Sequence, residues 1–237
     1  MKYLFYLLVL FLLASCSVFK KANTENVAPN GPHFVKIETD SGTMIARLFN
    51  KTPKTTANFL KLAKEHFYDS LLFHRVIKGF MIQGGDPDSK NAKPGQILGE
   101  GGLKYTVPAE FDTSLFHQKG AIAMARENDD VNPKKASSST QFYIVEGRTF
   151  TDNEMNKIEE KFNIVIPESH RSIYRSIGGA PFLDMNYTVF GQVIDGLDVI
   201  DKIAQAAKDE HNRPLQDIHM KISIMKKNEY KKYLKKH

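Results

Sequence analysis

Short runs in which apolar and polar residues alternate dominate the chain from about residue 34 onward. Val35, Ile37 and Thr39 alternate with polar neighbours, and Asp40-Ser41-Gly42 supplies a turn before the alternation resumes toward Leu48. This pattern predicts a β-hairpin. Further runs, separated by Gly, Pro and Asn, have the composition of strands at 73–77, 80–83, 121–125, 141–145, 189–194 and 219–225. Many short strands with few helices favour a mainly β fold, an antiparallel sandwich or barrel.

Helical spacing interrupts the strands at two places. Thr52-Pro53 has the form of an N-cap followed by a first-turn proline, and the residues after it place an apolar stripe on one helical face. A second stripe begins at Leu197 and runs to Ala207. The sequence therefore predicts two amphipathic helices beside the strands.

The segment 151–178 departs from the strand rhythm. It opens with the capping box Thr151-Asp152-Asn153-Glu154, and a second helical stripe after Pro167 stops at Gly178-Gly179. We therefore expect a helical hairpin inserted into the β domain.

The N-terminal residues have the layout of an export signal. Lys2 precedes an apolar run over 3–13, which is shorter than the roughly 20 residues of a membrane span. The run ends in Leu13-Ala14-Ser15-Cys16, which resembles the bacterial lipobox, although an incidental cysteine in a hydrophobic leader would look the same. This resemblance implies a signal peptide over 1–15, lipidation of Cys16, and a membrane-tethered lipoprotein of the cell envelope on the periplasmic face of the inner or outer membrane.

The remaining organisation follows from composition. Polar residues without apolar periodicity over 16–32 predict a flexible linker, and the globular domain then extends over 33–226. The net charge of +6 is concentrated in a basic tail over 227–237, which is typical of a solvated segment. An electrostatic contribution at an anionic membrane, about 1 kcal/mol per Lys, is the alternative. An exported protein has little access to nucleic acid, so no nucleic-acid partner is expected.

Several chemistries lack support in the sequence. The single cysteine excludes an internal disulfide, and no pair of histidines at i, i+4 spacing indicates a metal site. Metalloprotease, serine hydrolase, phosphate-loop and dinucleotide motifs do not occur, and the glycines at 99–102 are interpreted as a loop. We expect neither a metal nor a cofactor.

Arg75 stands among Phe, Val, Ile and Met in the run 73–86. Strand alternation would place Phe73, Arg75 and Ile77 on one face, and arginine is almost never fully buried without a partner. Two interpretations remain open: an arginine ion-paired to a carboxylate within a barrel, or an arginine at the edge of an apolar pocket, held by Gln83.

The run Phe-His-Arg-Val-Ile-Lys-Gly-Phe-Met-Ile-Gln-Gly-Gly-Asp over 73–86 resembles the signature of the cyclophilins. Segments 120–125, 139–144, 182–184 and 188–191 resemble further cyclophilin segments in the same order, so the similarity covers about 34–225 apart from the insert. The resemblance implies a closed eight-stranded antiparallel barrel with two capping helices. It also implies a peptidyl-prolyl cis/trans isomerase, here a monomer acting on proline-containing unfolded or exported polypeptides without a cofactor.

The resemblance assigns roles to individual positions. Arg75 and Gln83 correspond to the catalytic arginine and its supporting glutamine. The residues implied to bind the substrate are Phe80, Met81, Ala125, Arg126, Gln141, Tyr143, Phe182, Leu183 and Tyr187. Four of these depart from common family residues, with Phe182 for Trp, Tyr187 for His, Tyr143 for Phe and Arg126 for Asn. Activity is expected to survive, with weaker binding of cyclosporin-type inhibitors.

A mechanism without metal or nucleophile suits this reaction, because X-Pro rotation faces a barrier of about 18–20 kcal/mol that arises from amide conjugation. A guanidinium that donates to the prolyl nitrogen as it leaves the amide plane would stabilise the twisted state selectively. The rival function is a non-catalytic cyclophilin-like holdase or assembly module. The insert would emerge near the pocket, where a lid, a client-docking surface and a stabilising decoration are all open alternatives.

Overall fold

The structure is a computed structural model that describes residues 31–236. The predicted signal peptide, Cys16 and nearly all of the linker lie outside these residues. No helix within the described part of the chain combines the length and apolar character needed to cross a membrane.

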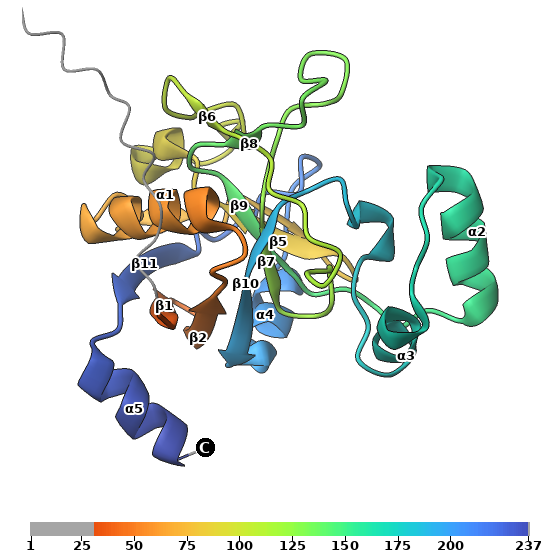
Figure 1. The fold of residues 1–237 in the computed structure, drawn as a ribbon. Coiled ribbons are helices and arrows are strands. Elements are labelled where there is room, and N and C mark those ends of the chain that lie inside the picture. Colours follow the sequence, from red (N-terminus) through yellow and green to blue (C-terminus); the bar gives the residue numbers. More distant parts are fainter. Residues whose placement is uncertain (1–30, 237) are drawn as a thin grey trace, which may run out of the picture.

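The elements alternate much as the sequence indicates (Figure 1). The strands are β1 (His33–Thr39), β2 (Gly42–Leu48), β3 (Leu71–Leu72), β4 (Arg75–Ile77), β5 (Met81–Gly84), β6 (Thr106–Val107), β7 (Ala121–Met124), β8 (Ser137–Ser138), β9 (Phe142–Val145), β10 (Val189–Asp195) and β11 (His219–Ile224). The helices are α1 (Pro53–Lys64), α2 (Asp152–Phe162), α3 (Glu168–Ser176), α4 (Leu197–Ala204) and α5 (Lys227–Lys236), with 3-10 turns η1 (Pro87–Asn91) and η2 (Pro181–Leu183).

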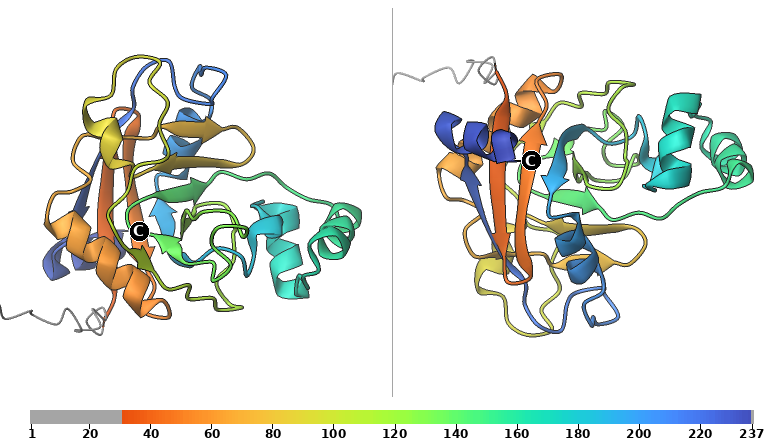
Figure 2. Two further views of the ribbon diagram at one scale, coloured as in Figure 1. Left: turned by 90° about the horizontal axis from the view of Figure 1, so that it is seen from above. Right: turned by 90° about the horizontal axis from the view of Figure 1, so that it is seen from below.

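Nine of the strands form one curled antiparallel sheet in the order β3-β11-β1-β2-β10-β7-β9-β5-β4, while β6 and β8 pair separately (Figure 2). The ladder is open between its edge strands β3 and β4, so the prediction of a closed eight-stranded barrel is wrong in strand number and in closure. The cause lies at Phe73 and His74, which separate β3, paired with β11, from β4, paired with β5. The strand expected over 73–77 therefore begins only at Arg75, and the chain itself connects the two edges.

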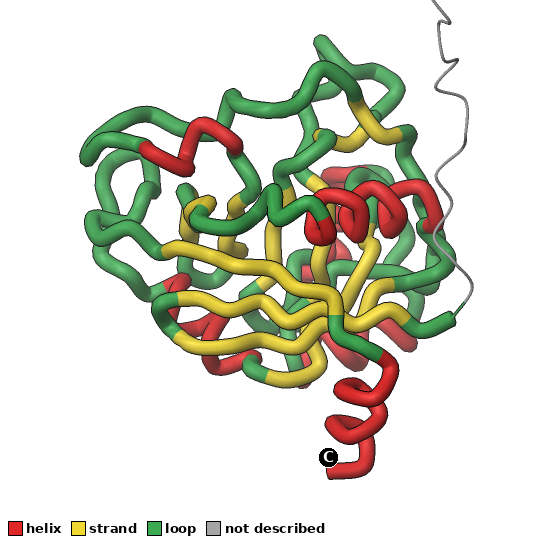
Figure 3. Tube along the Cα trace, turned by 90° about the vertical axis from the view of Figure 1, so that its left-hand side faces the viewer, coloured by secondary structure: helices red, strands yellow, loops and turns green. Residues whose placement is uncertain are grey.

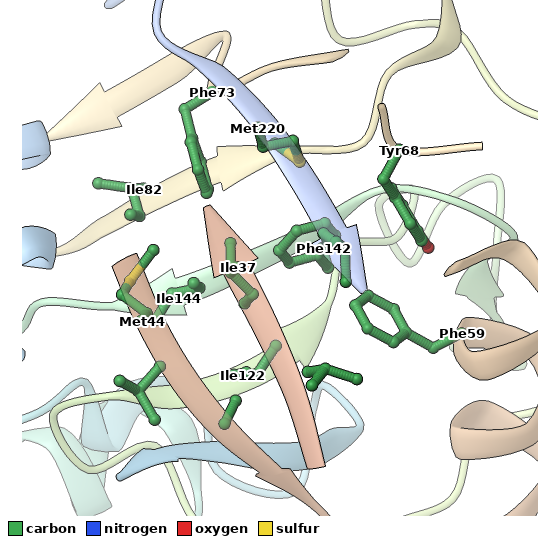
Figure 4. Close-up of a cluster of buried hydrophobic side chains, with 14 of the residues drawn as sticks. Ile37, Met44, Phe59, Tyr68, Phe73, Ile82, Ile122, Phe142, Ile144 and Met220 are labelled. Atoms are coloured by element: carbon green, nitrogen blue, oxygen red, sulfur yellow. The ribbon is translucent and has the colours of Figure 1, made fainter. Parts of the chain in front are cut away.

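The main core fills the interior of the curled sheet (Figure 4). Phe59 of α1 is fully buried and its ring packs against those of Tyr68, Phe142 and Phe190 at centroid distances of 5.0–5.4 Å. Helix α1 packs against β11, whereas α4 packs against β2, β4 and β5, and both contribute buried apolar residues to this core. Burial of aromatic and aliphatic surface on this scale is the dominant stabilising term in a fold of this kind.

The start of α1 differs in detail from the expected cap. Thr52 and Pro53 stand at the first positions, but the Thr52 side chain makes no capping hydrogen bond. The Glu110 carboxylate instead accepts from the backbone N–H groups of Lys54 and Thr55, at 3.0 and 2.8 Å. A carboxylate at a helix N-terminus also interacts favourably with the helix dipole, so a residue far along the chain provides the cap.

Helices α2 and α3 form the predicted hairpin and stand to one side of the sheet (Figures 1 and 2). The capping box is confirmed, with Thr151 Oγ1 accepting from Glu154 N and the Glu154 carboxylate accepting from Thr151 N. Helix α3 buries His170 and Tyr174 toward the rest of the molecule. The hairpin therefore has its own small core and one face packed on the domain.

The C-terminal basic segment forms the helix α5, which the sequence analysis did not predict (Figure 3). Tyr230 stacks on Phe34 of β1 at a centroid distance of 4.8 Å, whereas Lys227, Lys231 and Lys232 are exposed. The Tyr230 ring thus holds the segment against the sheet while these charges stay in solvent.

Candidate active site

The site is built on the face of the sheet opposite to the main core. Phe142 and Ile144 of β9 lie in the core, so strand alternation sends Tyr143 and Val145 to the other face. Cross-strand register then aligns Arg75 with Gln83, Gln83 with Tyr143, and Tyr143 with Ala123. Residues from β4, β5, β9 and β7 therefore form one continuous row.

The break between β3 and β4 changes one expectation about this face. Phe73 was expected to share a face with Arg75 and Ile77, but it lies in the main core with Val76. Ile77 packs with the site cluster. Because the strand is interrupted before Arg75, alternation cannot be extended from Arg75 back to Phe73.

A chain of side-chain hydrogen bonds positions Arg75. Arg75 Nη1 donates to Gln83 Oε1 at 3.1 Å, and Gln83 Nε2 donates to Gln141 Oε1 at 3.0 Å. Gln141 Nε2 in turn donates to the carbonyls of Gly99 and Gly101, at 2.8 and 2.7 Å. This observation favours the pocket-edge interpretation of Arg75, because its hydrogen-bond partner here is an amide and not a carboxylate.

Arg75 is half-buried, and burial lowers the pKa of its guanidinium from the usual value, partly offset by nearby Tyr187. Arginine still remains protonated in proteins near neutral pH. A cation that is partly stripped of water interacts more strongly with a polar group placed beside it. The arrangement can therefore present N–H donors and positive charge to an electron pair at this spot.

The guanidinium borders a hollow of about 420 Å³. Its lining contains most of the expected pocket residues, namely Arg75, Phe80, Met81, Gln83, Ala125, Arg126, Tyr143, Leu183 and Tyr187, together with His74, Leu98, Gly99, Glu100 and Asn128. Phe182 lies beside this lining and packs its ring on Phe80 at a centroid distance of 5.5 Å. One face of the hollow is thus aromatic and aliphatic, and one edge is cationic.

A second hollow of about 450 Å³ adjoins the first and shares Gln83, Gly99, Glu100, Ala125 and Arg126 with it. Gln141 lines this second hollow together with the loop that includes Gly101. The glycine-rich segment, interpreted from sequence as a plain loop, is therefore a wall of the site. Two adjoining hollows suit an extended peptide with neighbouring side chains in separate depressions.

Arg126 was expected to add a charge beside the groove. Its side chain is only 6% exposed and forms an ion pair with Asp129 at 2.6 Å. The guanidinium carbon lies 4.6 Å from the centroid of the Tyr187 ring, and Nε donates to the Asn186 carbonyl at 2.8 Å. Arg126 therefore anchors the loop that carries Tyr187, and much of its charge is already engaged.

The turn between β4 and β5 holds Arg75 and Phe80 in place. Gly79 occupies it with φ of 75°, a conformation that favours glycine, and Phe80 N donates to the Ile77 carbonyl at 3.0 Å. The Glu146 carboxylate accepts from Gly79 N, and burial raises the pKa of this carboxyl. The glycine and the glutamate together fix the tip of the strand pair.

Sequence reasoning missed a buried polar group behind the pocket wall, formed by His117, Asp184 and Tyr174. Tyr143 itself was expected, but the partner of its hydroxyl was not: His117 Nε2 lies 3.0 Å from Tyr143 Oη. Asp184 stood in the quoted 182–184 segment, and its place between Leu183 and Met185 was the only signal. No grouping of three His, Cys, Asp or Glu side chains suited to a metal ion occurs within residues 31–236.

Comparison with known proteins shows which family shares this sequence. Residues 34–224 match the model of the family described as cyclophilin type peptidyl-prolyl cis-trans isomerase/CLD. A protein of Staphylococcus aureus (strain USA300), named as a peptidyl-prolyl cis-trans isomerase, is 35% identical over 185 residues, which are 78% of this chain and 87% of that protein. A protein of Streptococcus pyogenes serotype M6, named as a bifunctional phosphatase/peptidyl-prolyl cis-trans isomerase, is 35% identical over 84% of this chain and 39% of its own length.

Solved structures of the same family have a similar fold. The crystal structure of a cyclophilin type peptidyl-prolyl cis-trans isomerase from Cryptosporidium parvum has a TM-score of 0.61 and 25% identity, covering 83% of this chain and 99% of that one. A second structure of that protein, determined in the presence of the dipeptide Ala-Pro, has a TM-score of 0.60 and covers 81% of this chain. The aligned part includes most of the domain described above.

Proposed function

This chain belongs to the cyclophilin-type peptidyl-prolyl cis-trans isomerases, and we propose that Arg75 carries the isomerisation by weakening amide conjugation at the X-Pro bond. The supporting observation is the half-buried guanidinium at the edge of a hollow with an aromatic and aliphatic wall, held by Gln83 at 3.1 Å. The apolar wall suits a pyrrolidine ring, and the cationic edge suits the prolyl nitrogen.

The proposed chemistry needs no covalent intermediate. As the bond twists, the nitrogen lone pair leaves conjugation with the carbonyl and becomes a hydrogen-bond acceptor. An N–H of Arg75 donates to that lone pair, an interaction unavailable in either planar form. Preorganised donors of this kind typically contribute about two to three powers of ten in rate.

Gln83 and Gln141 serve this mechanism by orientation. Gln83 accepts from Arg75 and donates to Gln141, so the guanidinium plane is fixed before substrate arrives. Gln141 is fixed in turn by two backbone carbonyls. Preorganisation reduces the reorganisation required during the reaction.

The substrates proposed are proline-containing unfolded or exported polypeptides. The Cryptosporidium relative was crystallised in the presence of Ala-Pro, which supports a short Ala-Pro peptide as a first probe. The rival is a non-catalytic holdase that uses the same groove. The linked pair of Arg75 and Gln83 favours the enzyme, since binding alone does not require an oriented guanidinium.

A protease-coupled assay on an Ala-Pro peptide tests the role of Arg75. Arg75→Ala should lower kcat/KM by about 100-fold, and Arg75→Lys should recover only part of the rate because an ammonium lacks the planar fork. Far-UV circular dichroism and thermal melting check that each variant is folded. Wild-type rates in Arg75→Ala would refute the mechanism.

We also propose that the protein is tethered at the cell envelope. Cys16 follows a leader-like apolar run, which supports export, lipidation and tethering at the cell envelope. A Cys16→Ser variant should lose incorporation of a labelled fatty acid and move from the membrane pellet to the soluble fraction. Retention of label in that variant would refute lipidation at Cys16 without touching the isomerase assignment.

A further inference from the structure

A buried hydrogen-bond chain runs from the inserted hairpin to the pocket wall. Tyr174 Oη of α3 donates to Asp184 Oδ2 at 2.7 Å. Asp184 Oδ1 lies 2.8 Å from His117 Nδ1 and accepts from His117 N at 2.9 Å. His117 Nε2 lies 3.0 Å from Tyr143 Oη. Tyr143 lines the hollow beside Arg75, so the chain links the insert to the proposed site.

The chain is shielded from solvent along its length. Tyr174 and His117 are 0% exposed, Tyr143 is 4% exposed and Asp184 is 8% exposed. Burial raises the pKa of both tyrosine hydroxyls, with Asp184 adding to the effect, so each keeps its proton and donates. If Tyr143 donates to His117 Nε2, the imidazole proton resides on Nδ1 and points at Asp184. Every polar atom in the chain then has a complementary partner.

Apolar contacts follow the same route. The ring of Phe116 is stacked on that of His170 of α3 at 3.8 Å and meets Tyr174 edge-on at 5.6 Å. Phe182 packs on Phe80 on one side and on Phe162 of α2, at 6.2 Å, on the other. Phe182 therefore touches both the pocket cluster and the core of the insert.

Backbone hydrogen bonds at the base of the insert also connect it to the segment that holds His117. Gly179 N donates to the Arg148 carbonyl at 3.0 Å, and Ala180 N donates to the His117 carbonyl at 2.8 Å. A Cβ atom on Gly179 would come within 2.2 Å of that same His117 carbonyl oxygen, which allows only glycine to fit. The exit of the insert and the loop carrying Phe182 are thus pinned to the segment that holds His117.

We propose that Tyr174 is a positioning residue for the isomerase site, acting through Asp184 and His117 to hold the Tyr143 ring and the loop that carries Leu183 and Tyr187. The inference rests on the proposed site at Arg75. It assigns the inserted hairpin a role as a brace of the substrate pocket. Neither closure over the site nor client docking is required for this role.

Tyr174→Phe removes the first link and keeps the ring in place. Loss of a hydrogen bond to a carboxylate changes an equilibrium constant by about 10- to 100-fold. Only part of this change is transmitted to substrate binding, because Tyr174 acts through Asp184 and His117. A looser wall weakens the ground and transition states alike, so KM should rise about three- to tenfold with little change in kcat. A purely structural role would instead reduce the folded fraction and lower kcat at constant KM.

Arg175→Ala is the matched control. Arg175 is the next residue of α3 and pairs with Asp152 and Glu168 inside the insert, away from Asp184. Its KM should stay within about twofold of wild type, because exposed ion pairs contribute little. In a Tyr143→Phe background, which uncouples His117 from the wall, the effect of Tyr174→Phe on KM should fall by at least half.

The test uses full-length protein, an Ala-Pro tetrapeptide and Arg75→Ala as reference. A KM change below about twofold in Tyr174→Phe, or an equal change in Arg175→Ala, would overturn the inference. The ¹⁵N spectrum of His117 gives an answer even if Tyr174→Phe fails to fold: a protonated Nδ1 and a bare Nε2 are expected, and the opposite tautomer contradicts the chain. Full activity in Arg75→Ala would reject the site itself, an outcome separate from these.

Discussion

Gln83→Leu isolates the contribution of the amide chain to catalysis, because leucine has a similar size but no polar group. Gln83 accepts from Arg75 at 3.1 Å and donates to Gln141 at 3.0 Å, so the substitution removes both bonds. A hydrogen bond to a charged group contributes about 1.5–3 kcal/mol and a neutral one about 0.5–1.5 kcal/mol. If at least about 1.4 kcal/mol of this orients the guanidinium, kcat/KM should fall tenfold or more.

The assay is isomerisation of an Ala-Pro peptide, compared with Gln192→Leu. Gln192 is also half-buried, and its amide donates to the Lys119 carbonyl at 2.9 Å, away from the hollow. Gln83→Leu should lose about 2–4.5 kcal/mol of unfolding free energy and Gln192→Leu about 0.5–1.5 kcal/mol per lost bond, yet only Gln83→Leu should lose activity. Equal activities in the two variants would refute the view that Gln83 orients Arg75.

Three further outcomes follow from burial and contacts. Burial lowers the pKa of His74 to about 4, so the folded state binds this proton less readily than the unfolded state. The free energy of unfolding, measured by urea titration, should therefore fall by about 3 kcal/mol more in wild type than in His74→Leu between pH 7 and pH 4. Phe59→Ala should cost about 3–5 kcal/mol in the same titration, against under about 1 kcal/mol for exposed Phe162→Ala. Arg126→Asn removes the contact over Tyr187 and should raise KM about two- to fivefold at constant kcat, which peptide kinetics would show.

The sequence predicted much of the fold because its signals are local. Alternation and strand-like composition identified eight of the eleven strands, missing the two-residue strands β3, β6 and β8, and the capping box at Thr151 identified the hairpin. The start of β4 at Arg75 and not at Phe73 was not predictable, since it depends on which neighbours β3 and β4 pair with. The cap of α1 was missed for the same reason, because Glu110 is distant in sequence from the helix it caps.

The site residues were likewise predictable where the signal is local and not where it depends on the fold. Register across β4, β5 and β9 brings Arg75 and Gln83 of the 73–86 run together with Tyr143, as expected, whereas Phe73 of the same run lies in the main core. The chain behind Tyr143 was invisible to pattern analysis, since His117 and Asp184 carry no periodic signal and meet across 67 positions. Long-range polar pairing is set by the fold, so it could only be recognised in the structure.

Cis/trans exchange of an Ala-Pro peptide, measured by NMR with wild type and Arg75→Ala, separates catalysis by Arg75 from peptide binding. Titrating the peptide into each protein gives its affinity, and the exchange rate gives its turnover. Arg75→Ala should still bind the peptide, since Phe80, Met81 and Tyr143 remain, while exchange in the complex falls about 100-fold. Exchange at the wild-type rate in Arg75→Ala would show that Arg75 does not carry the isomerisation.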